Sequence, residues 1–292
     1  MVRKAVITAA GLGTRLLLAT KEMPKEMLPL FCSGQGVNLL LKPVLQLIFE
    51  QLYDLGFREF CFVVGRGKRS IEDHFTPDYN YIELLKGKNK VNLVKNLEEF
   101  YQKVEKSIIF WVNQPEPRGF GHAVLMAEPF IGQEPFLVHA GDTYILSENY
   151  SPIKRLLDHY AFRKPHAALI LKEVHDHQKI YGCAVAKEIE KEILKVEYVV
   201  EKPEEPPSNL AIMPIYIFDP VIFRALKQTG PGVGGEIQLT DAIQKLIEWG
   251  MRVEAIKLRE DDVRLDVGTP ETYWEALNIS YLRLSRGRVH HE

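Results

Sequence analysis

Short apolar runs alternate with amphipathic helical patterns along most of this chain, and this alternation is the strongest constraint on its fold. The run Ala5–Ala9 contains three β-branched residues, and Phe60–Val64 is a second apolar run. Between them, apolar residues at helical spacing predict a helix over 43–55, which Gly56 would end. Two buried strands joined by a helix form a parallel βαβ unit.

The same alternation continues towards the C-terminus. Further strands are predicted over 107–112, 136–140, 166–171, 180–186, 193–201 and 211–218, and helices over 121–127 and from 151. The stretch 81–106 is polar with helical periodicity, which predicts a solvated helical excursion. We therefore expect an α/β fold: a Rossmann-like, mostly parallel mixed sheet flanked by helices, with a β-rich insertion that covers one side.

Composition narrows the class of protein. The 292 residues are 46% hydrophobic and 26% charged, which excludes collagen, low-complexity disorder and coiled coil. A formal net charge of −2 does not favour nucleic-acid binding, and no apolar run approaches the ~20 residues of a membrane span. Cys32, Cys61 and Cys183 lie far apart and lack metal-binding spacing. We expect a cytoplasmic protein with no nucleic-acid or membrane partner.

A glycine-rich loop, Gly11–Arg15, directly follows the first predicted strand. Its two glycines let backbone N–H groups approach a phosphate, and Arg15 can neutralise the phosphate charge. The dinucleotide-binding pattern would need a third glycine where Leu16 stands and an acidic residue at the end of the second strand, where the chain has Val63–Gly65. The glycines alone leave two interpretations open, a nucleotide-phosphate loop and a plain strand-to-helix turn.

The next segment, Thr20–Leu30, favours the phosphate loop. It is rich in proline and charge, unlike a core strand, and it brings Lys25 close in sequence to Arg15. Two fixed cations suit a polyphosphate, because negative charge grows on the leaving oxygens as the bond to phosphorus breaks. A polyphosphate is therefore the predicted ligand of this region.

Several motifs in a fixed order resemble the sugar-1-phosphate nucleotidylyltransferases. The segments Gly11–Arg15 and Pro24–Pro29 match the signature of that family, in the form typical of its bacterial-type UTP–glucose-1-phosphate uridylyltransferases. The resemblance extends along nearly the whole chain, through Ile71–Phe75, Gly119–Val124, Gly141-Asp142, Glu201–Pro203, Pro206–Ile212 and Gly235–Ile243. The last of these segments is especially typical of the uridylyltransferases.

The resemblance implies an enzyme that transfers a uridylyl group from UTP to glucose 1-phosphate, giving UDP-glucose and pyrophosphate. The sugar phosphate would attack the α-phosphorus in line, assisted by Mg²⁺. One nucleotidyltransferase domain would span 1–292, with a nucleotide-binding part at about 1–145, a sugar-binding part at about 146–268 and a C-terminal helix over 269–292. The resemblance also implies a homo-oligomer, either a dimer or a tetramer.

Roles for individual residues follow from the same resemblance. Arg15 and Lys25 would stabilise the pyrophosphate, Lys202 would place the attacking sugar phosphate, and Asp142 would hold the metal ion together with Asp266. The nucleotide would be bound by Ala10, Gly11, Gly13, Thr14, Glu26, Gln114 and Gly119. The sugar would be bound by Gly182, Glu201, Asn209 and Glu236.

Elementary chemistry supports part of this assignment. Asp142 follows a predicted buried strand, where a carboxylate is costly without a cation, although an aspartate that only caps a turn is the alternative for it and for Asp266. Lys202 precedes a proline, which predicts extended backbone that points the lysine outward. The Gln114 amide can read a pyrimidine edge with one donor and one acceptor.

Two departures from the family pattern keep alternatives open. Gln114–Pro117 resembles the related thymidylyltransferases, so an enzyme that uses dTTP with the same sugar phosphate is the nearest rival. Pro214 stands where relatives carry glycine near the sugar. A rival of another class is a catalytically silent regulatory subunit that binds nucleotide sugars. His122 and His139 are expected to be packed or hydrogen bonded, since an ionised phosphate needs no general base to attack.

Overall fold

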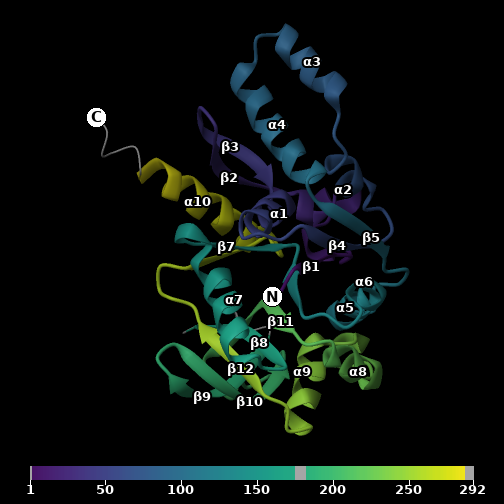
Figure 1. The fold of residues 1–292 in the computed structure, drawn as a ribbon, viewed down its shortest axis with the longest axis vertical. Coiled ribbons are helices and arrows are strands. Elements are labelled where there is room, and N and C mark those ends of the chain that lie inside the picture. The colour runs from purple at the N-terminus through teal and green to yellow at the C-terminus, as the bar shows by residue number, and fades with distance from the viewer. Residues whose placement is uncertain (1, 175–181, 287–292) are drawn as a thin grey trace.

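A nine-stranded sheet forms the centre of the computed structural model, which describes residues 2–174 and 182–286 (Figure 1). In spatial order its strands are β5 (Ile108–Asn113), β4 (Glu59–Val64), β1 (Lys4–Ala9), β6 (Phe136–Ala140), β11 (Leu210–Phe218), β8 (Ala167–Glu173), β12 (Val253–Lys257), β10 (Ile193–Glu201) and β9 (Gly182–Glu190). Strands β11 and β10 run antiparallel to their neighbours, and the other seven share one direction. The predicted mixed, mostly parallel sheet is confirmed.

Helices cover both faces of this sheet. One face packs against α1 (Val44–Asp54) and α7 (Ser151–Arg163), and the other against α5 (Phe120–Met126), α8 (Val221–Gln228) and α9 (Leu239–Glu248). Residues of β1 alternate between the two cores: Ile7 joins the first and Val6 the second, and both are fully buried. Burial on both faces explains why the strands read as continuous apolar runs in the sequence.

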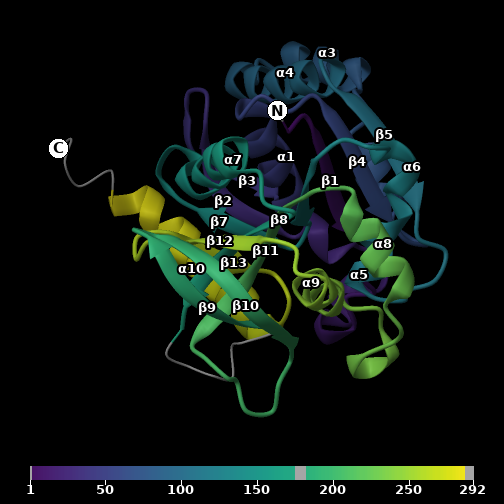
Figure 2. The same ribbon diagram turned by 60° about the horizontal axis from the view of Figure 1, so that its bottom comes forward.

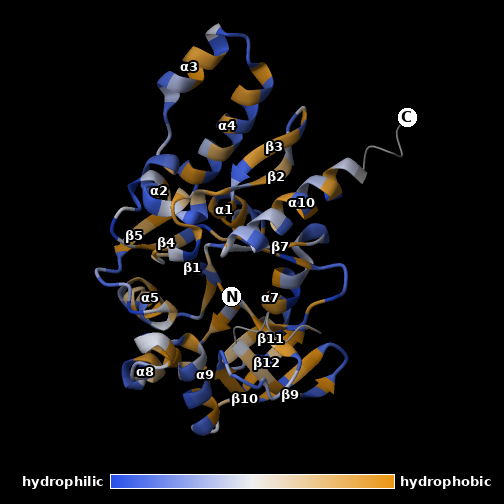
Figure 3. Cartoon of the chain, turned by 180° about the vertical axis from the view of Figure 1, so that it is seen from behind, coloured by the Kyte–Doolittle hydropathy of each residue, from blue (hydrophilic) through white to orange (hydrophobic). Residues whose placement is uncertain are grey.

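The predicted helical excursion is confirmed as two helices, α3 (Tyr79–Gly87) and α4 (Val91–Glu105). They stand away from the sheet at the top of Figure 1. Two shorter helices, α2 (Arg69–His74) and α6 (Glu128–Ile131), lie near the first half of the sheet. Figure 3 shows that apolar residues concentrate in the sheet strands, whereas the connecting loops are mostly hydrophilic.

The β-rich part lies at the other end of the sheet, where β9 and β10 form a long twisted pair beside α9 (Figure 2). The predicted strand over 180–186 begins outside the described residues, and the observed strand starts at Gly182. None of the helices in the described ranges is long and apolar enough to cross a membrane. All three cysteines are free thiols.

Two small ribbons complete the fold, and sequence reasoning predicted neither. The first pairs β2 (Pro29–Gly34) with β3 (Val37–Pro43), and the C-terminal helix α10 (Pro270–Arg286) packs on it. The second pairs β7 (Thr143–Leu146) with β13 (Val263–Asp266). This second ribbon matters for function because its register sets Asp266 opposite Thr143, the neighbour of Asp142.

Candidate active site

A cavity of about 560 Å³ opens at the carboxyl ends of β1, β6 and β10. This is the edge at which ligands collect in open α/β sheets, because the loops that leave parallel strands converge there. Of the residues predicted from the sequence, fifteen line the cavity: Ala10, Gly11, Gly13, Thr14, Arg15, Lys25, Glu26, Gln114, Gly119, Asp142, Gly182, Glu201, Lys202, Glu236 and Asp266.

Asn209 is the one predicted site residue that does not line this cavity. Its amide nitrogen donates a hydrogen bond of 2.8 Å to Glu173 at the end of β8. Cavity-lining residues that sequence reasoning missed include Thr8, Leu12, Pro117, Phe120, Ala123, Ala140, Thr143, Ile212, Tyr216, Gln238, Leu239, Thr240, Arg264 and Gly268. Several of these had a signal in the sequence, because they lie within the motifs Gly11–Arg15, Gln114–Pro117, Gly119–Val124, Pro206–Ile212 and Gly235–Ile243.

The glycine-rich loop lies directly beside Lys25. A Cβ atom on Gly11 would lie 3.6 Å from Cε of Lys25, so the loop backbone and the lysine share one wall of the cavity. Gly13 has φ of 68°, a left-handed conformation that favours glycine, and its carbonyl accepts a 2.8 Å hydrogen bond from Thr20. The loop is therefore a shaped turn that leaves its backbone open to a ligand.

Arg15 reaches the same cavity from the other side of the loop. A Cβ atom on Gly268 would lie 3.2 Å from Nη2 of Arg15 and 3.1 Å from Oδ1 of Asp266. The glycine at this position thus leaves room for a guanidinium and a carboxylate in one corner. The structure thus brings the two cations from the start of the chain together with two carboxylates, Asp142 and Asp266, that lie far from them in the sequence.

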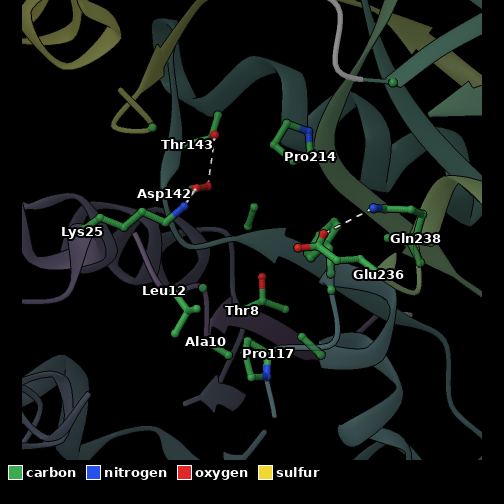
Figure 4. Close-up of a pocket in the computed structure, with 18 of the residues that line it drawn as sticks. Thr8, Ala10, Leu12, Lys25, Pro117, Asp142, Thr143, Pro214, Glu236 and Gln238 are labelled. Atoms are coloured by element: carbon green, nitrogen blue, oxygen red, sulfur yellow. Dashed lines mark hydrogen bonds and ion pairs between the residues drawn. The ribbon is translucent and has the colours of Figure 1, made fainter. Parts of the chain in front are cut away.

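Lys25 forms an ion pair with Asp142, and Figure 4 shows the two side chains pointing toward each other. Burial disfavours ionisation of Asp142, but the charges of Lys25 and Arg264 outweigh it and lower the pKa of the carboxyl to about 2. Burial also opposes the charge on Lys25, yet Asp142 and Glu26 raise its pKa. Both groups are therefore ionised at neutral pH.

Asp266 is the second carboxylate at this point. The backbone N–H of Val267 donates to the carbonyl of Asp142 at 3.0 Å, which holds the two segments together. Burial raises the pKa of Asp266, and the nearby negative charge of Asp142 adds to that effect against the opposing Arg264. Nη2 of Arg264 lies 3.4 Å from Oδ2 of Asp266. Two carboxylates that disfavour each other's charge form a place where a cation is stabilised.

Glu26 lies deep in the cavity wall and is only 1% exposed. Burial raises the pKa of its carboxyl, and the nearby ammonium of Lys68 opposes that effect. Gly141 packs directly against it, since a Cβ atom there would lie 3.3 Å from Cγ of Glu26. The ammonium of Lys68 and the close packing of Gly141 together fix the orientation of the Glu26 side chain.

The far side of the cavity comes from the β-rich half. Oγ1 of Thr240 donates a 2.7 Å hydrogen bond to Oε2 of Glu201, and Nε2 of Gln238 donates to Glu236 at 3.3 Å. A Cβ atom on Gly182 would come within 3.4 Å of the Glu201 carboxylate, so the glycine leaves space above that group. Oriented acceptors with open space in front of them suit the hydroxyl groups of a sugar.

Lys202 does not have the extended backbone that the following proline predicts. Its φ is 41°, in the left-handed region, so the prediction of extended geometry is wrong. Such a conformation costs about 1–3 kcal/mol and persists where the surrounding structure enforces it, often at functional sites. Lys202 nevertheless lines the cavity, with Nζ 3.8 Å from Oε1 of Glu201.

Pro214 lies on the cavity wall within β11, as Figure 4 shows. The pairing of β11 with β8 shifts register between Met213 and Tyr216, which places the proline at an irregularity of the strand. Proline lacks the N–H that a regular ladder uses, so it is tolerated at such a point. The departure from the family pattern is thus accommodated without breaking the sheet.

Gln114 and Gly119 enclose a short loop between β5 and α5. Gly119 has φ of 101°, and a Cβ atom there would lie 2.7 Å from Cβ of Glu236 and 2.8 Å from the carbonyl of Ile237. Nε2 of Gln114 lies 3.1 Å from the carbonyl oxygen of Gly119 and 2.9 Å from Nδ1 of His122. The loop is therefore held by a hydrogen bond within itself, and it packs closely against the backbone segment that carries Glu236.

Both histidines are hydrogen bonded, as expected. His122 contacts Gln114, and His139 is fully buried with Nδ1 2.8 Å from the carbonyl of Ala140. Within the described residues, no group of three or more histidine, cysteine, aspartate or glutamate side chains could hold a metal ion by itself. A metal ion here would depend on two carboxylates and on ligands that come with the substrate.

Comparison with known proteins agrees with this geometry. A family model for nucleotidyl transferases matches residues 4–281. The chain belongs to the nucleotidyl transferase family. The predicted resemblance is confirmed for this nucleotidyl transferase: the UTP–glucose-1-phosphate uridylyltransferase of Pseudomonas aeruginosa is 38% identical, over 99% of this chain and 100% of that protein.

Two further similarities, one of sequence and one of structure, support the assignment of this chain to the nucleotidyl transferase family. The UTP–glucose-1-phosphate uridylyltransferase of Streptococcus pneumoniae is 40% identical, over 91% of this chain and 86% of that protein. Among solved structures, UDP-glucose pyrophosphorylase complexed with UDP-glucose matches with a TM-score of 0.82 and 34% identity, over 97% of this chain and 100% of that one. The predicted α/β fold is therefore confirmed along the length of the nucleotidyl transferase.

Proposed function

We propose that this nucleotidyl transferase transfers the uridylyl group of UTP to glucose 1-phosphate and releases UDP-glucose and pyrophosphate. The observation that carries the proposal is that one cavity contains a glycine-rich loop, two cations, two carboxylates and a set of oriented acceptors. Its relatives are named uridylyltransferases, and they align with nearly the whole of this chain. Their names support uracil as the base.

The reaction is a single displacement at phosphorus. A phosphate oxygen of glucose 1-phosphate attacks the α-phosphorus of UTP and forms a new P–O bond, while the bond from that phosphorus to the bridging oxygen breaks. The electron pair leaves with pyrophosphate. The attacking oxygen is already ionised, so no general base is needed, which is consistent with the structural contacts of His122 and His139. Catalysis then consists of positioning and charge stabilisation.

The residues divide between the two substrates in this proposal. Arg15 and Lys25 stabilise the charge that develops on pyrophosphate, because Arg15 ends the glycine-rich loop and Lys25 lies beside Gly11 of the same loop. Lys202 places the attacking phosphate, and Glu201, Glu236 and the space above Gly182 receive the sugar. Ala10, Gly11, Gly13, Thr14, Glu26, Gln114 and Gly119 bind the nucleotide. The Asn209 side chain is hydrogen bonded to Glu173, so it would have to break that hydrogen bond and turn to contact the sugar.

Mg²⁺ fits the donor set as the expected metal. Asp142 directly precedes β7, and Asp266 ends β13 opposite Thr143, so the two residues supply carboxylate oxygens at one end of the ribbon. Mg²⁺ commonly binds through one or two carboxylates together with substrate phosphates. When bound, the ion would neutralise phosphate charge and orient the reacting groups. Lys25, released from Asp142, would be free to face the phosphates.

The test is pyrophosphate release with Mg²⁺ and glucose 1-phosphate, with UTP, dTTP, ATP, CTP and GTP offered separately. The proposal expects release with UTP above all others. Equal or greater release with dTTP would favour the thymidylyltransferase instead. Binding of nucleotide sugars without any release of pyrophosphate would favour the regulatory subunit.

A variant sharpens this test. Lys202→Gln should raise KM for glucose 1-phosphate with little change in KM for UTP, since its charge faces only the sugar phosphate in this proposal. Lys245→Gln on α9, outside the cavity lining, is the matched control. The cytoplasmic location, the homo-oligomer and the division into parts at about 145 and 268 stay predictions.

A further inference from the structure

The contacts of Gln114 fix the orientation of its amide. A carbonyl oxygen can only accept a hydrogen bond, so the amide atom 3.1 Å from the oxygen of Gly119 must be the nitrogen, Nε2. The same nitrogen lies 2.9 Å from Nδ1 of His122. An amide nitrogen can donate two hydrogen bonds and cannot accept one, so both N–H groups of Gln114 are hydrogen bonded to atoms of the protein itself.

This orientation also fixes the tautomer of His122. Because Nε2 of Gln114 donates, Nδ1 of His122 must accept, and the ring proton of a neutral imidazole then resides on its other nitrogen. Burial, followed by the nearby charge of Arg118, lowers the pKa of His122, which favours the neutral ring. The ring sits in the first turn of α5, where the positive end of the helix also disfavours imidazolium.

We infer that His122 is a positioning residue that locks the Gln114 amide so that only its oxygen, Oε1, is presented to the nucleotide base. The inference rests on the proposed function, because it assumes that Gln114 contacts the base. It corrects the sequence-based interpretation in which the amide offers the base one donor and one acceptor. The structure leaves the base only an acceptor.

An acceptor at this position selects the base by simple chemistry. The base of a uridine or thymidine nucleotide has a single N–H, on ring atom N3, and that group pairs with Oε1. Cytosine is of the same size, but its N3 carries a lone pair, so it would face Oε1 acceptor to acceptor. A site with a fixed polar group rejects a ligand that leaves the group unpaired far more strongly than one of merely wrong size. His122 would therefore maintain the preference for UTP over CTP.

Two substitutions of nearly equal size separate this role from simple packing. Asn carries its side-chain oxygen at the position of Nδ1, so His122→Asn keeps an acceptor for Gln114. His122→Leu has the same branched shape and no acceptor. Val124 lies in the same helix, is fully buried and does not line the cavity. Val124→Ala is therefore the control for a general loss of packing around α5.

The measurement is kcat/KM for pyrophosphate release with UTP and with CTP. His122→Leu should lower the ratio of UTP to CTP by about tenfold or more, the size of one hydrogen bond, mainly through a higher KM for UTP. His122→Asn and Val124→Ala should keep the wild-type ratio. An unchanged ratio in His122→Leu, or equal losses in the Leu and Asn variants, would overturn the inference.

A second measurement needs no variant and so does not depend on folding. The nitrogen-15 spectrum of wild-type protein with labelled histidine should show Nδ1 of His122 without a proton at pH 7.5, both alone and with UTP added. A protonated Nδ1 would rule the inference out. If the wild type binds UTP more tightly than CTP but releases no pyrophosphate, the proposed reaction fails while the inference about the base stands.

Discussion

Nζ of Lys68 lies 2.8 Å from Oε2 of Glu26, and both side chains are almost completely buried. Lys68 belongs to the turn between β4 and α2, whereas Glu26 lies in the proline-rich segment 42 residues earlier in the chain. Lys68 does not line the cavity, but Glu26 does. The lysine thus balances a buried charge from outside the site and holds a site residue in place.

Replacing Lys68 by methionine should destabilise the protein strongly. The change leaves the buried Glu26 carboxylate without its ion-pair partner, and breaking a buried pair in this way typically costs about 3–5 kcal/mol. The free energy of unfolding, from urea denaturation, measures this loss. The double variant Lys68→Met/Glu26→Gln should recover most of the stability, because it removes both charges, yet it should not recover UTP binding.

The control for this prediction is an ion pair of the same kind at the surface. Lys86 pairs with Glu83 and Glu98 on α3 and α4, but its side chain is 48% exposed. Lys86→Met should change the unfolding free energy little, since exposed pairs are screened by water and salt. Equal losses for Lys68→Met and Lys86→Met would contradict the proposed role of burial.

His74 should make stability depend on pH. Its Nε2 lies 3.0 Å from Oε1 of Gln46, and burial lowers its pKa to about 4. The unfolded chain, with a pKa near 6.5, binds the proton first as the pH falls. Stability from His74 is therefore complete above about pH 6.5 and is lost as the pH falls towards 4, by about 3 kcal/mol in all.

The measurement is the unfolding free energy between pH 7 and pH 4 for the wild type and for His74→Leu. The variant should show a shallower fall across this window, because it has no proton to take up at this position. His139, whose pKa burial also lowers to about 4, leaves part of the slope in place. Parallel curves for the two proteins would show that His74 does not titrate in this way.

The fold was predictable where residues are buried on both sides. Strands such as β1 and β6 are continuous apolar runs because helices cover both of their faces. The β2–β3 ribbon escaped prediction because most of its residues are only partly buried, so its sequence lacks a clear alternation. A ribbon whose residues are mostly half-buried, one strand of it packing on α10, leaves little signal in its own sequence.

The site was predictable in its members and less so in their geometry. The carboxyl ends of parallel strands form one edge of the sheet, so the cations and carboxylates that follow those strands were expected to meet there. The left-handed backbone of Lys202 and the turn of Asn209 toward Glu173 depend on tertiary contacts that no local pattern encodes. The same holds for the Gln114 amide, whose donors are consumed by Gly119 and by a histidine eight residues later.

Replacing Gly119 by alanine should damage both stability and UTP binding. A Cβ atom there would lie 2.7 Å from Cβ of Glu236 and 2.8 Å from the backbone oxygen of Ile237, so one of two backbone segments must move. Gly132→Ala is the matched control, since Gly132 also has a positive φ, of 64°, but nothing lies within 4 Å of its added Cβ. The control should lose only the cost of its strained backbone conformation, about 1–3 kcal/mol.

Urea denaturation and calorimetric titration with UTP measure the two effects. Gly119→Ala should lose more stability than Gly132→Ala and should bind UTP more weakly, because the loop that holds Gln114 is displaced. Gly132→Ala should bind UTP as the wild type does. Similar stability and similar affinity in the two variants would mean that the close backbone crossing at Gly119 tolerates a methyl group.

Replacing Asp142 by asparagine should lower the rate of pyrophosphate release by about 10²–10³, the usual effect of removing one group that stabilises transition-state charge. The carboxyl, with a pKa of about 2, is ionised under all working conditions, so the variant removes a full charge from the proposed magnesium site. The Mg²⁺ concentration for half-maximal rate should rise as well. Asp158→Asn, on the exposed face of α7, is the control and should change neither quantity. Turnover near the wild-type value in Asp142→Asn would remove this residue from the metal site.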